Sequence, residues 1–250
     1  MENPYLAMVR RIQANSTSYQ TFDVETLADY GLDSVDCPEC NNRGYIVYQK
    51  DGVTYSRECK CMEQRRYNRR INKSGMDDMM KRYTFDSYQA ADAYRKGLKE
   101  RAMQFCNADK GWWYISGRAG SGKTHICVAM CNQFARQGKE VRYMLWRDEA
   151  TVLKGMVNDP EYHKRMDKLK TVPVLYIDDF FKTGKQAVTT ADINLAFELI
   201  NGRYNNADLR TIISSELSVK DIIELDEATG SRIWERSMKI RAPQENWRLK

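Results

Sequence analysis

The glycine-rich segment at residues 117–124 constrains the fold of this chain more than any other feature. It reads Gly-Arg-Ala-Gly-Ser-Gly-Lys-Thr and fits the P-loop pattern, Gly-x4-Gly-Lys-Thr, at every fixed position. The apolar residues 112–116 before it predict a strand, and residues 123–136 after it predict a helix. Glycines let such a loop curl until its N–H groups converge on phosphate oxygens at the helix N-terminus. The segment therefore predicts a phosphate site in an α/β fold.

The polar residues of this motif have expected roles in binding ATP. Lys123 is expected to bring a positive charge to the outer phosphates, and the Thr124 hydroxyl to ligate Mg²⁺. The predicted backbone and side-chain contacts to the phosphates are Gly117, Gly120, Ser121 and Gly122.

A second element is expected to bring a carboxylate to the magnesium. Residues 174–179 form an apolar run that ends in Asp178 and Asp179, the form of a Walker B strand. We expect Asp178 to hold Mg²⁺ through water, and Asp179 to orient or activate the attacking water. The alternative is that these acids only cap the end of a strand.

Strands and helices alternate along the chain from residue 76 onward. Expected strands are 112–116, 141–146, 174–177, 211–214 and 239–241. Expected helices are 90–106, 123–136, 147–170 with an interruption near Pro160, 190–205, 221–224 and 231–238. This alternation predicts a mostly parallel sheet with helices on both faces.

Four of the seven cysteines lie close together upstream of the alternating region. Cys37 and Cys40 flank a tight turn, and Cys59 and Cys61 are two apart, so in an extended chain both point to the same face. Four thiolates suit a closed, tetrahedral, structural Zn²⁺ site. The alternative is a set of reduced structural thiols. The residues between the pairs, around Asp51-Gly52, predict a hairpin.

Composition indicates a globular, non-membrane protein. No apolar run approaches the roughly 20 residues of a membrane-spanning helix, and the first residues lack the apolar core of a signal peptide. We expect a cytoplasmic protein. Residues 1–36 hold two basic and six acidic side chains, whereas residues 37–85 hold eleven basic and six acidic ones. A basic surplus is compatible with nucleic acid binding, but it equally fits a solvated helix face.

The polar stretch around Gly75 predicts a boundary between two domains. Residues 1–75 would form an N-terminal helical and zinc-binding domain, with short helices at 3–14 and 24–30 and a charged helix at 62–72. Residues 76–250 would form the nucleotide-binding domain. The first domain has so few apolar residues that it is expected to depend on its metal for folding.

These motifs resemble the DnaC/IstB-like branch of the AAA+ ATPases, the bacterial and phage replicative helicase loaders. The resemblance covers about residues 76–250. It rests on the P-loop followed by His125 and on the Ile-Asp-Asp ending of the Walker B strand. Three further segments share it, namely 211–215, 230–233 and 245–248. It adds His125 to the expected ATP-binding residues. The zinc-bearing segment before it looks like the DnaI type of loader.

The resemblance implies further roles for individual residues. Arg232 matches the arginine finger that reaches a neighbouring subunit's γ-phosphate, with Arg236 as the second candidate, so ATP would bind at a site shared through self-association. The 18 residues after Arg232 leave no room for a helical lid. At the sensor-1 position, Ser214 and Ser215 precede Glu216, so either a serine hydroxyl takes the role or hydrolysis is slow. Candidate contacts to single-stranded DNA are Arg147, Lys154, Lys182 and Lys185.

The function implied is that of an ATP-dependent loader, which binds a replicative helicase hexamer and places it on single-stranded DNA during replication initiation. One alternative is an IstB-type transposition helper, which serves a transposase on duplex DNA. Another is a zinc-containing binding adaptor whose nucleotide site acts only as a switch. The zinc-bearing segment favours the loader.

Overall fold

A computed structural model describes residues 35–184, 187–243 and 245–247. The chain forms two compact units, residues 1–65 and 66–250, and the division falls within helix α2 (Cys61–Ser74). The predicted domain boundary after residue 75 lies further along, past the end of this helix, and stays a prediction. The helices predicted at 3–14 and 24–30 lie outside the described residues.

The first unit is built on a two-stranded hairpin. Strands β1 (Tyr45–Lys50) and β2 (Val53–Glu58) pair antiparallel, as predicted from the Asp-Gly turn. Asp51 and Gly52 both have positive φ, 53° and 76°, which is what a two-residue hairpin turn requires. Nearly all described side chains of the hairpin are at least partly exposed, and the buried core of this unit consists of Cys37, Cys40 and Cys59.

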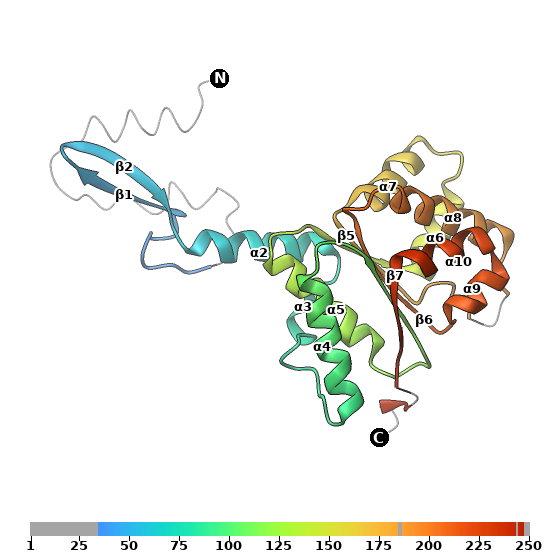
Figure 1. Cartoon of the computed structure of the whole chain (residues 1–250). Coiled ribbons are helices and arrows are strands. Elements are labelled where there is room, and N and C mark those ends of the chain that lie inside the picture. The colour runs from blue at the N-terminus through green and yellow to red at the C-terminus, as the bar shows by residue number, and fades with distance from the viewer. Residues whose placement is uncertain (1–34, 185–186, 244, 248–250) are drawn as a thin grey trace. The chain divides into compact units, whose positions relative to one another are not determined.

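The second unit contains a five-stranded, all-parallel sheet (Figure 1). Its strands stand in the order β4 (Val141–Leu145), β5 (Val174–Asp178), β6 (Arg210–Ser215), β3 (Trp112–Ser116) and β7 (Ser237–Arg241). Strand β3, which precedes the P-loop, therefore lies between β6 and β7, and β5, which ends in the two acids, lies between β4 and β6. The predicted parallel α/β sheet is confirmed.

Helices cover both faces of this sheet (Figure 1). One face carries α3 (Asp77–Arg82), α4 (Ala93–Asn107) and α5 (Lys123–Arg136). The other carries α6 (Trp146–Gly155), α7 (Pro160–Thr171), α8 (Thr190–Tyr204), α9 (Val219–Leu225) and α10 (Glu227–Arg236). Successive side chains of β3 point to opposite faces of the sheet. Trp113 accordingly packs in the core of the first face and Trp112 in the core of the second.

The last helix was predicted wrongly at its start. It begins at Glu227, because the Asp226 side chain accepts a hydrogen bond from the Thr229 N–H and caps it, whereas the sequence prediction began at residue 231. Gly230 is therefore inside the helix. A Cβ there would lie 2.6 Å from the backbone nitrogen of Ile223, so this glycine permits the close packing of α9 against α10.

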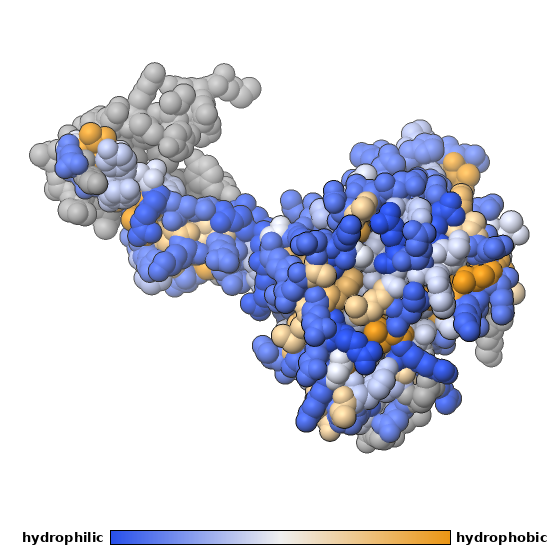
Figure 2. All heavy atoms as spheres, viewed as in Figure 1, coloured by the Kyte–Doolittle hydropathy of each residue, from blue (hydrophilic) through white to orange (hydrophobic). Residues whose placement is uncertain are grey.

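The surface of both units is mainly hydrophilic on the face shown in Figure 2, with hydrophobic residues in small patches. None of the described helices is long and apolar enough to cross a membrane.

Candidate nucleotide site and metal centre

The P-loop connects β3 to α5 in the predicted manner. Gly122 has a φ of 86° and stands at the N-cap of α5, so only a residue without a Cβ adopts this turn at little cost. The Gly117 N–H donates to the Ser215 carbonyl at 3.1 Å, which ties the loop to the neighbouring strand β6. The buried Lys123 Nζ donates to the Gly117 and Arg118 carbonyls at 2.6 and 2.9 Å. The lysine is thus held inside the curve of the loop.

Two observations indicate that this loop fits a phosphate group. Ser121 is buried, and its hydroxyl oxygen has no hydrogen-bond partner among the described residues. Burial also lowers the pKa of Lys123, which means that the folded chain by itself does not fully compensate this charge. An anion bound in the loop would satisfy both groups.

Four hydroxyl groups, from α5, β4, β6 and β5 itself, surround Asp178 at the end of β5. Thr124 Oγ1 lies 3.4 Å from both of its carboxylate oxygens, and Tyr176 and Tyr143 donate at 2.7 and 3.2 Å. Ser214, on β6, also donates to it. The predicted magnesium ligands Thr124 and Asp178 are therefore adjacent. Oxygen donors of this kind suit Mg²⁺.

Asp179 follows in a left-handed conformation, with a φ of 53°. Its side chain accepts a hydrogen bond from Lys182 Nζ at 3.0 Å, and the same Nζ lies 2.9 Å from Glu216. Burial alone lowers the pKa of Lys182, but its hydrogen bonds to Glu216 and Asp179 outweigh burial and raise the pKa above its usual value. Asp179 and Glu216 thus form an acid pair bridged by one lysine.

Ser214 and Ser215, at the predicted sensor-1 position, bond to residues at and after the end of β5. Ser214 donates to Asp178 and accepts from the Asp179 N–H at 3.2 Å, while Ser215 donates to the Phe180 carbonyl at 2.7 Å. Both hydroxyls therefore hold the Walker B turn in place. Which group takes the sensor-1 role stays a prediction.

The C-terminal residues pack directly on the P-loop. The Trp247 N–H donates to the Gly120 carbonyl at 3.0 Å, and a Cβ on Gly120 would lie 1.9 Å from the Asn246 side-chain oxygen. Arg95, on α4, lies over the Trp247 ring at 3.8 Å and pairs with Glu245 at 3.4 Å. Contacts of this segment with Gly120 therefore restrain the shape of the loop.

His125 contacts the residues that precede α4. The His125 ring is tilted against Tyr83 and meets Tyr88 edge-on, and its Nε2 lies 3.2 Å from the Thr84 carbonyl. Burial lowers the pKa of His125. His125 therefore joins the residues before α4 to the P-loop helix. Its predicted ATP contact and the arginine-finger role below are not tested by this single chain.

Arg232 lies on α10, where it packs against α8. Its guanidinium donates to the Asn201 side chain at 3.1 Å and to the Ala228 carbonyl at 2.7 Å. Arg236, the second candidate, donates to the Tyr204 carbonyl at 2.9 Å.

The candidate DNA contacts have different surroundings. Lys154 pairs with the buried Asp192 at 2.6 Å, and Lys182 bridges the acid pair described above. Arg147 is exposed, and no hydrogen bond or ion pair of its guanidinium occurs within the described part of the chain. Lys185 lies outside the described residues.

The four clustered cysteines form a second candidate site in the first unit. Their sulfur atoms all lie within 4.8 Å of one another, with Cys37 and Cys59 at 3.7 Å and Cys40 and Cys61 at 3.5 Å. Four sulfurs at about 2.3 Å from a tetrahedral zinc would be about 3.8 Å apart, so the cluster has the dimensions of a metal site.

Tight turns and hydrogen bonds hold the backbone around these cysteines. Asn41 and Asn42 have positive φ values of 47° and 64° and close the turn after Cys40, whose sulfur accepts the Gly44 N–H at 3.3 Å. The Asn42 side chain accepts the Cys37 N–H at 2.7 Å. These bonds fix the backbone on both sides of the first cysteine pair.

Several contacts at the nucleotide site were not predicted. Tyr176 precedes Asp178 by two residues on the same strand, so the period of two places both on one face, and this signal was available in the sequence. Tyr143 reaches Asp178 only because β4 aligns it with Tyr176. The packing of Asn246 and Trp247 on Gly120 has no local sequence signal.

Comparisons with known proteins agree with this geometry. A family model described as "IstB-like ATP binding protein" matches residues 48–239. The chain is 28% identical over 213 residues to the Phage-like element PBSX protein XkdC of Bacillus subtilis (strain 168), which covers 80% of this chain and 79% of that protein.

Two solved structures share the fold. The DnaC helicase loader superimposes with a TM-score of 0.56 at 22% identity over 64% of this chain and 97% of that one. DnaI gives a TM-score of 0.56 at 20% identity over 67% of this chain and 94% of that one. The family match spans the P-loop, both acids and Arg232. The chain belongs to the family of IstB-like ATP binding proteins.

Proposed function

We propose that this protein is an ATPase of the AAA+ class that loads a replicative DNA helicase onto single-stranded DNA. The observation that carries the nucleotide part is the close approach of Thr124 to Asp178 beside a buried P-loop lysine. In this proposal Lys123 binds the outer phosphates, and Thr124 and Asp178 hold Mg²⁺, which supplies charge neutralisation on the phosphates. Asp179 accepts the proton of the attacking water.

The loader part of the proposal rests on likeness to DnaC and DnaI and on the cysteine unit. We propose that Cys37, Cys40, Cys59 and Cys61 bind Zn²⁺ and that the unit they stabilise contacts the helicase. Tyr48 and Tyr55 support this, because their rings stack at 5.7 Å on the exposed hairpin and each is 44% exposed. Exposed aromatic side chains are frequent anchors of protein interfaces.

The test is co-purification with a replicative helicase hexamer, with and without ATP, followed by loading of the helicase onto closed single-stranded circles. We expect an ATP-dependent complex and helicase activity on the circles. Tyr48→Ala/Tyr55→Ala should weaken the complex but leave nucleotide binding unchanged. Failure of the wild-type chain to bind the helicase would exclude the loader function.

The family match favours one second candidate, a transposition helper, because the family model takes its name from IstB-like proteins. Binding to a transposase and to duplex DNA, without binding to the helicase, would establish this function instead.

A shared ATP site is also part of the proposal, with Arg232 acting on the neighbouring subunit. Lys123→Ala and Arg232→Ala should each lose ATPase activity. Mixing them should restore part of it, because some interfaces then combine an intact P-loop with an intact arginine. Absence of recovery in assembled mixtures would argue that the site is complete within one chain.

A further inference from the structure

Polar and aromatic side chains of α8 surround Arg232 where α10 packs on that helix. Phe197, Asn201 and Tyr204 are four and three residues apart along α8, so they line one face of the helix. Arg232 meets this face from α10. The three α8 residues have no part in the nucleotide site described above, but they decide how Arg232 is placed.

The guanidinium group of Arg232 is held at two of its nitrogen atoms. Nε donates to the Asn201 side-chain oxygen at 3.1 Å, and Nη1 donates to the Ala228 carbonyl, one turn earlier on α10, at 2.7 Å. Within the described part of the chain, no residue accepts a hydrogen bond from Nη2, and the side chain is only partly buried. Because arginine carries five N–H donors in a rigid fork, the held group keeps donors for a further acceptor.

Two aromatic rings of α8 limit the remaining freedom of this group. The guanidinium carbon of Arg232 lies 5.2 Å from the centre of the Phe197 ring and 5.5 Å from that of the Tyr204 ring. Both distances are within the roughly 6 Å over which an aromatic face attracts a cation. Tyr204 is itself fixed, because its hydroxyl donates to Glu235 at 2.7 Å. Hydrogen bonds and rings together restrict a side chain that otherwise has many rotamers.

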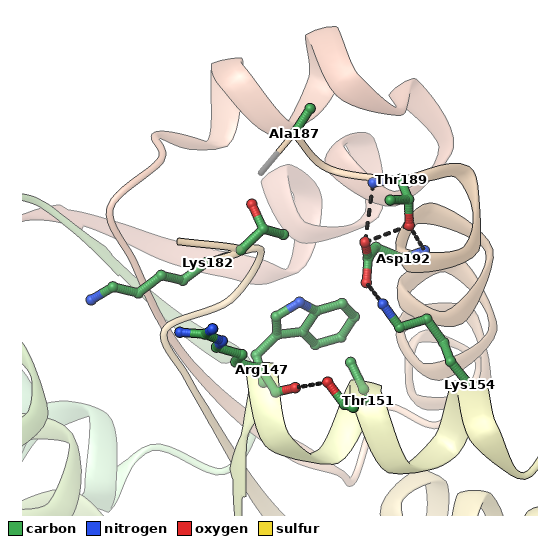
Figure 3. A pocket seen from close by; sticks show the side chains of 10 residues that line it. Arg147, Thr151, Lys154, Lys182, Ala187, Thr189 and Asp192 are labelled. Atoms are coloured by element: carbon green, nitrogen blue, oxygen red, sulfur yellow. Dashed lines mark hydrogen bonds and ion pairs between the residues drawn. The ribbon is translucent and has the colours of Figure 1, made fainter. Parts of the chain in front are cut away.

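Helix α8 is anchored near both ends, so it gives these contacts a rigid support. At its start, Thr189 and Asp192 form a capping box, and Lys154 from α6 lies 2.6 Å from the Asp192 carboxylate (Figure 3). Near its end, the fully buried Arg203 donates to the Leu169 carbonyl of α7 at 2.8 Å. The face of α8 that meets Arg232 therefore has a fixed position.

We propose that Asn201, together with the rings of Phe197 and Tyr204, positions Arg232 for the γ-phosphate of ATP bound to a neighbouring subunit. This role rests on the proposed function, in which Arg232 acts across the subunit boundary. A guanidinium that is already in place does not have to be ordered when charge develops on the phosphate. Loss of Asn201 therefore lowers kcat, while the P-loop of the same chain still binds ATP.

The test measures kcat and KM for ATP in the assembled protein. Asn201→Ala should lower kcat by roughly 10-fold, the effect of one hydrogen bond to a charged group, with KM unchanged. Asn201→Asp keeps an acceptor oxygen at the same place and should retain most of the turnover. The matched control is Asn194→Ala, an exposed asparagine on the same helix, which should behave as wild type. Equal kcat values for Asn201→Ala and Asn194→Ala would overturn the proposal.

Two combinations of variants separate positioning from a damaged fold. Asn201→Ala/Arg232→Ala should turn over no more slowly than Arg232→Ala, because Asn201 acts only through the arginine. A mixture of Asn201→Ala with Lys123→Ala should exceed the mean activity of the two variants, because some interfaces then combine an intact P-loop with a correctly held arginine. A further loss in the double variant, or no gain in the mixture, would overturn the positioning role.

NMR of the isotope-labelled chain tests the placement without turnover. The Arg232 Nε–H signal, assigned by its absence in Arg232→Lys, should exchange slowly with water in the wild-type chain and faster in Asn201→Ala. Fast exchange in the wild-type chain would contradict the proposal.

Failure of the proposed function is recognised separately. Full turnover in Arg232→Ala would refute the shared ATP site and this role with it. Loss of turnover in Arg232→Ala but not in Asn201→Ala would refute the positioning role alone.

Discussion

The two units of this chain reach a defined structure by different means. The second unit buries a large hydrophobic core on each face of its sheet. In the described residues of the first, the buried core is three cysteines with Ile46 and Cys61 packed against them. Burial of apolar area supplies most of the folding free energy of the sheet unit. We propose that the cysteine unit depends instead on bonds to a metal.

This difference suggests that each unit is sensitive to a perturbation that the other tolerates. Removal of a metal should act on the cysteine unit, and removal of a charge at the P-loop should act on the sheet unit. The predictions below test this separation.

The largest effect is expected from loss of a cysteine ligand. Cys37→Ser should reduce bound zinc from one per chain to almost none and unfold the hairpin, because a structural zinc contributes on the order of 10 kcal/mol to folding. Metal analysis and limited proteolysis at the hairpin measure this. Nucleotide binding by the sheet unit should remain.

The control for this variant is Cys106→Ala, a buried cysteine of the sheet unit outside the cluster. It should keep its zinc while lowering thermal stability. Retention of zinc by Cys37→Ser would refute the proposed ligand set, and loss of nucleotide binding would refute the independence of the units.

The next effect concerns the P-loop charge. Lys123→Ala should weaken ATP binding by roughly 10- to 100-fold, since hydrogen bonds to charged groups contribute about 1.5–3 kcal/mol. Titration calorimetry measures it, and the exposed Lys110→Ala serves as control. Zinc content should be unchanged. Equal ATP affinity in both variants would show that the nucleotide binds elsewhere.

A smaller effect is expected where the C-terminal segment meets the P-loop. Gly120→Ala places a Cβ against the Asn246 side chain and should displace the C-terminal segment. Alanine at a φ of 74° also carries about 1–2 kcal/mol of left-handed strain, so ATP binding should weaken by roughly 10-fold. Gly120→Ala/Asn246→Ala relieves the clash but not the strain. Partial recovery in the double variant is the expected result; no recovery would mean that backbone strain alone accounts for the loss.

The smallest effect concerns pH. Burial raises the pKa of Asp192, but hydrogen bonds from Lys154 and Thr189 outweigh burial and lower the pKa below its usual value. Because the native pKa is lowered, this stabilisation exists above the usual pKa near 3.8 and is lost as pH falls through the native pKa.

Asp192→Asn should therefore cost roughly 1–2 kcal/mol at neutral pH and progressively less below about pH 4. Urea unfolding at several pH values measures this difference, with the exposed Asp167→Asn as control. A difference that does not shrink in acid would assign the cost to packing rather than to charge.

Much of the fold was predictable because its signals are local. The P-loop, its strand and its helix were predicted with their observed bounds, since glycine spacing and apolar runs act over a few residues. The start of α10 was missed because its capping residue, Asp226, stands in a polar stretch that resembles a turn.

The cysteine cluster was predictable in part. Its spacing predicted a four-thiol site, and the sulfurs are indeed grouped at metal-binding distances. The contacts that orient it, such as Asn42 to the Cys37 N–H, come from a turn with positive φ that the spacing did not specify.

The sequence by itself determined the candidate residues for phosphate and metal chemistry and the succession of strands and helices along the chain. Those properties follow from local patterns of glycine, acid, cysteine and apolar residues. Only the tertiary structure decided that Lys182 joins Asp179 to Glu216, that Tyr143 supports Asp178, and that Trp247 binds the P-loop. These contacts join residues far apart in the chain, and their geometry depends on strand order and register, which no local pattern specifies.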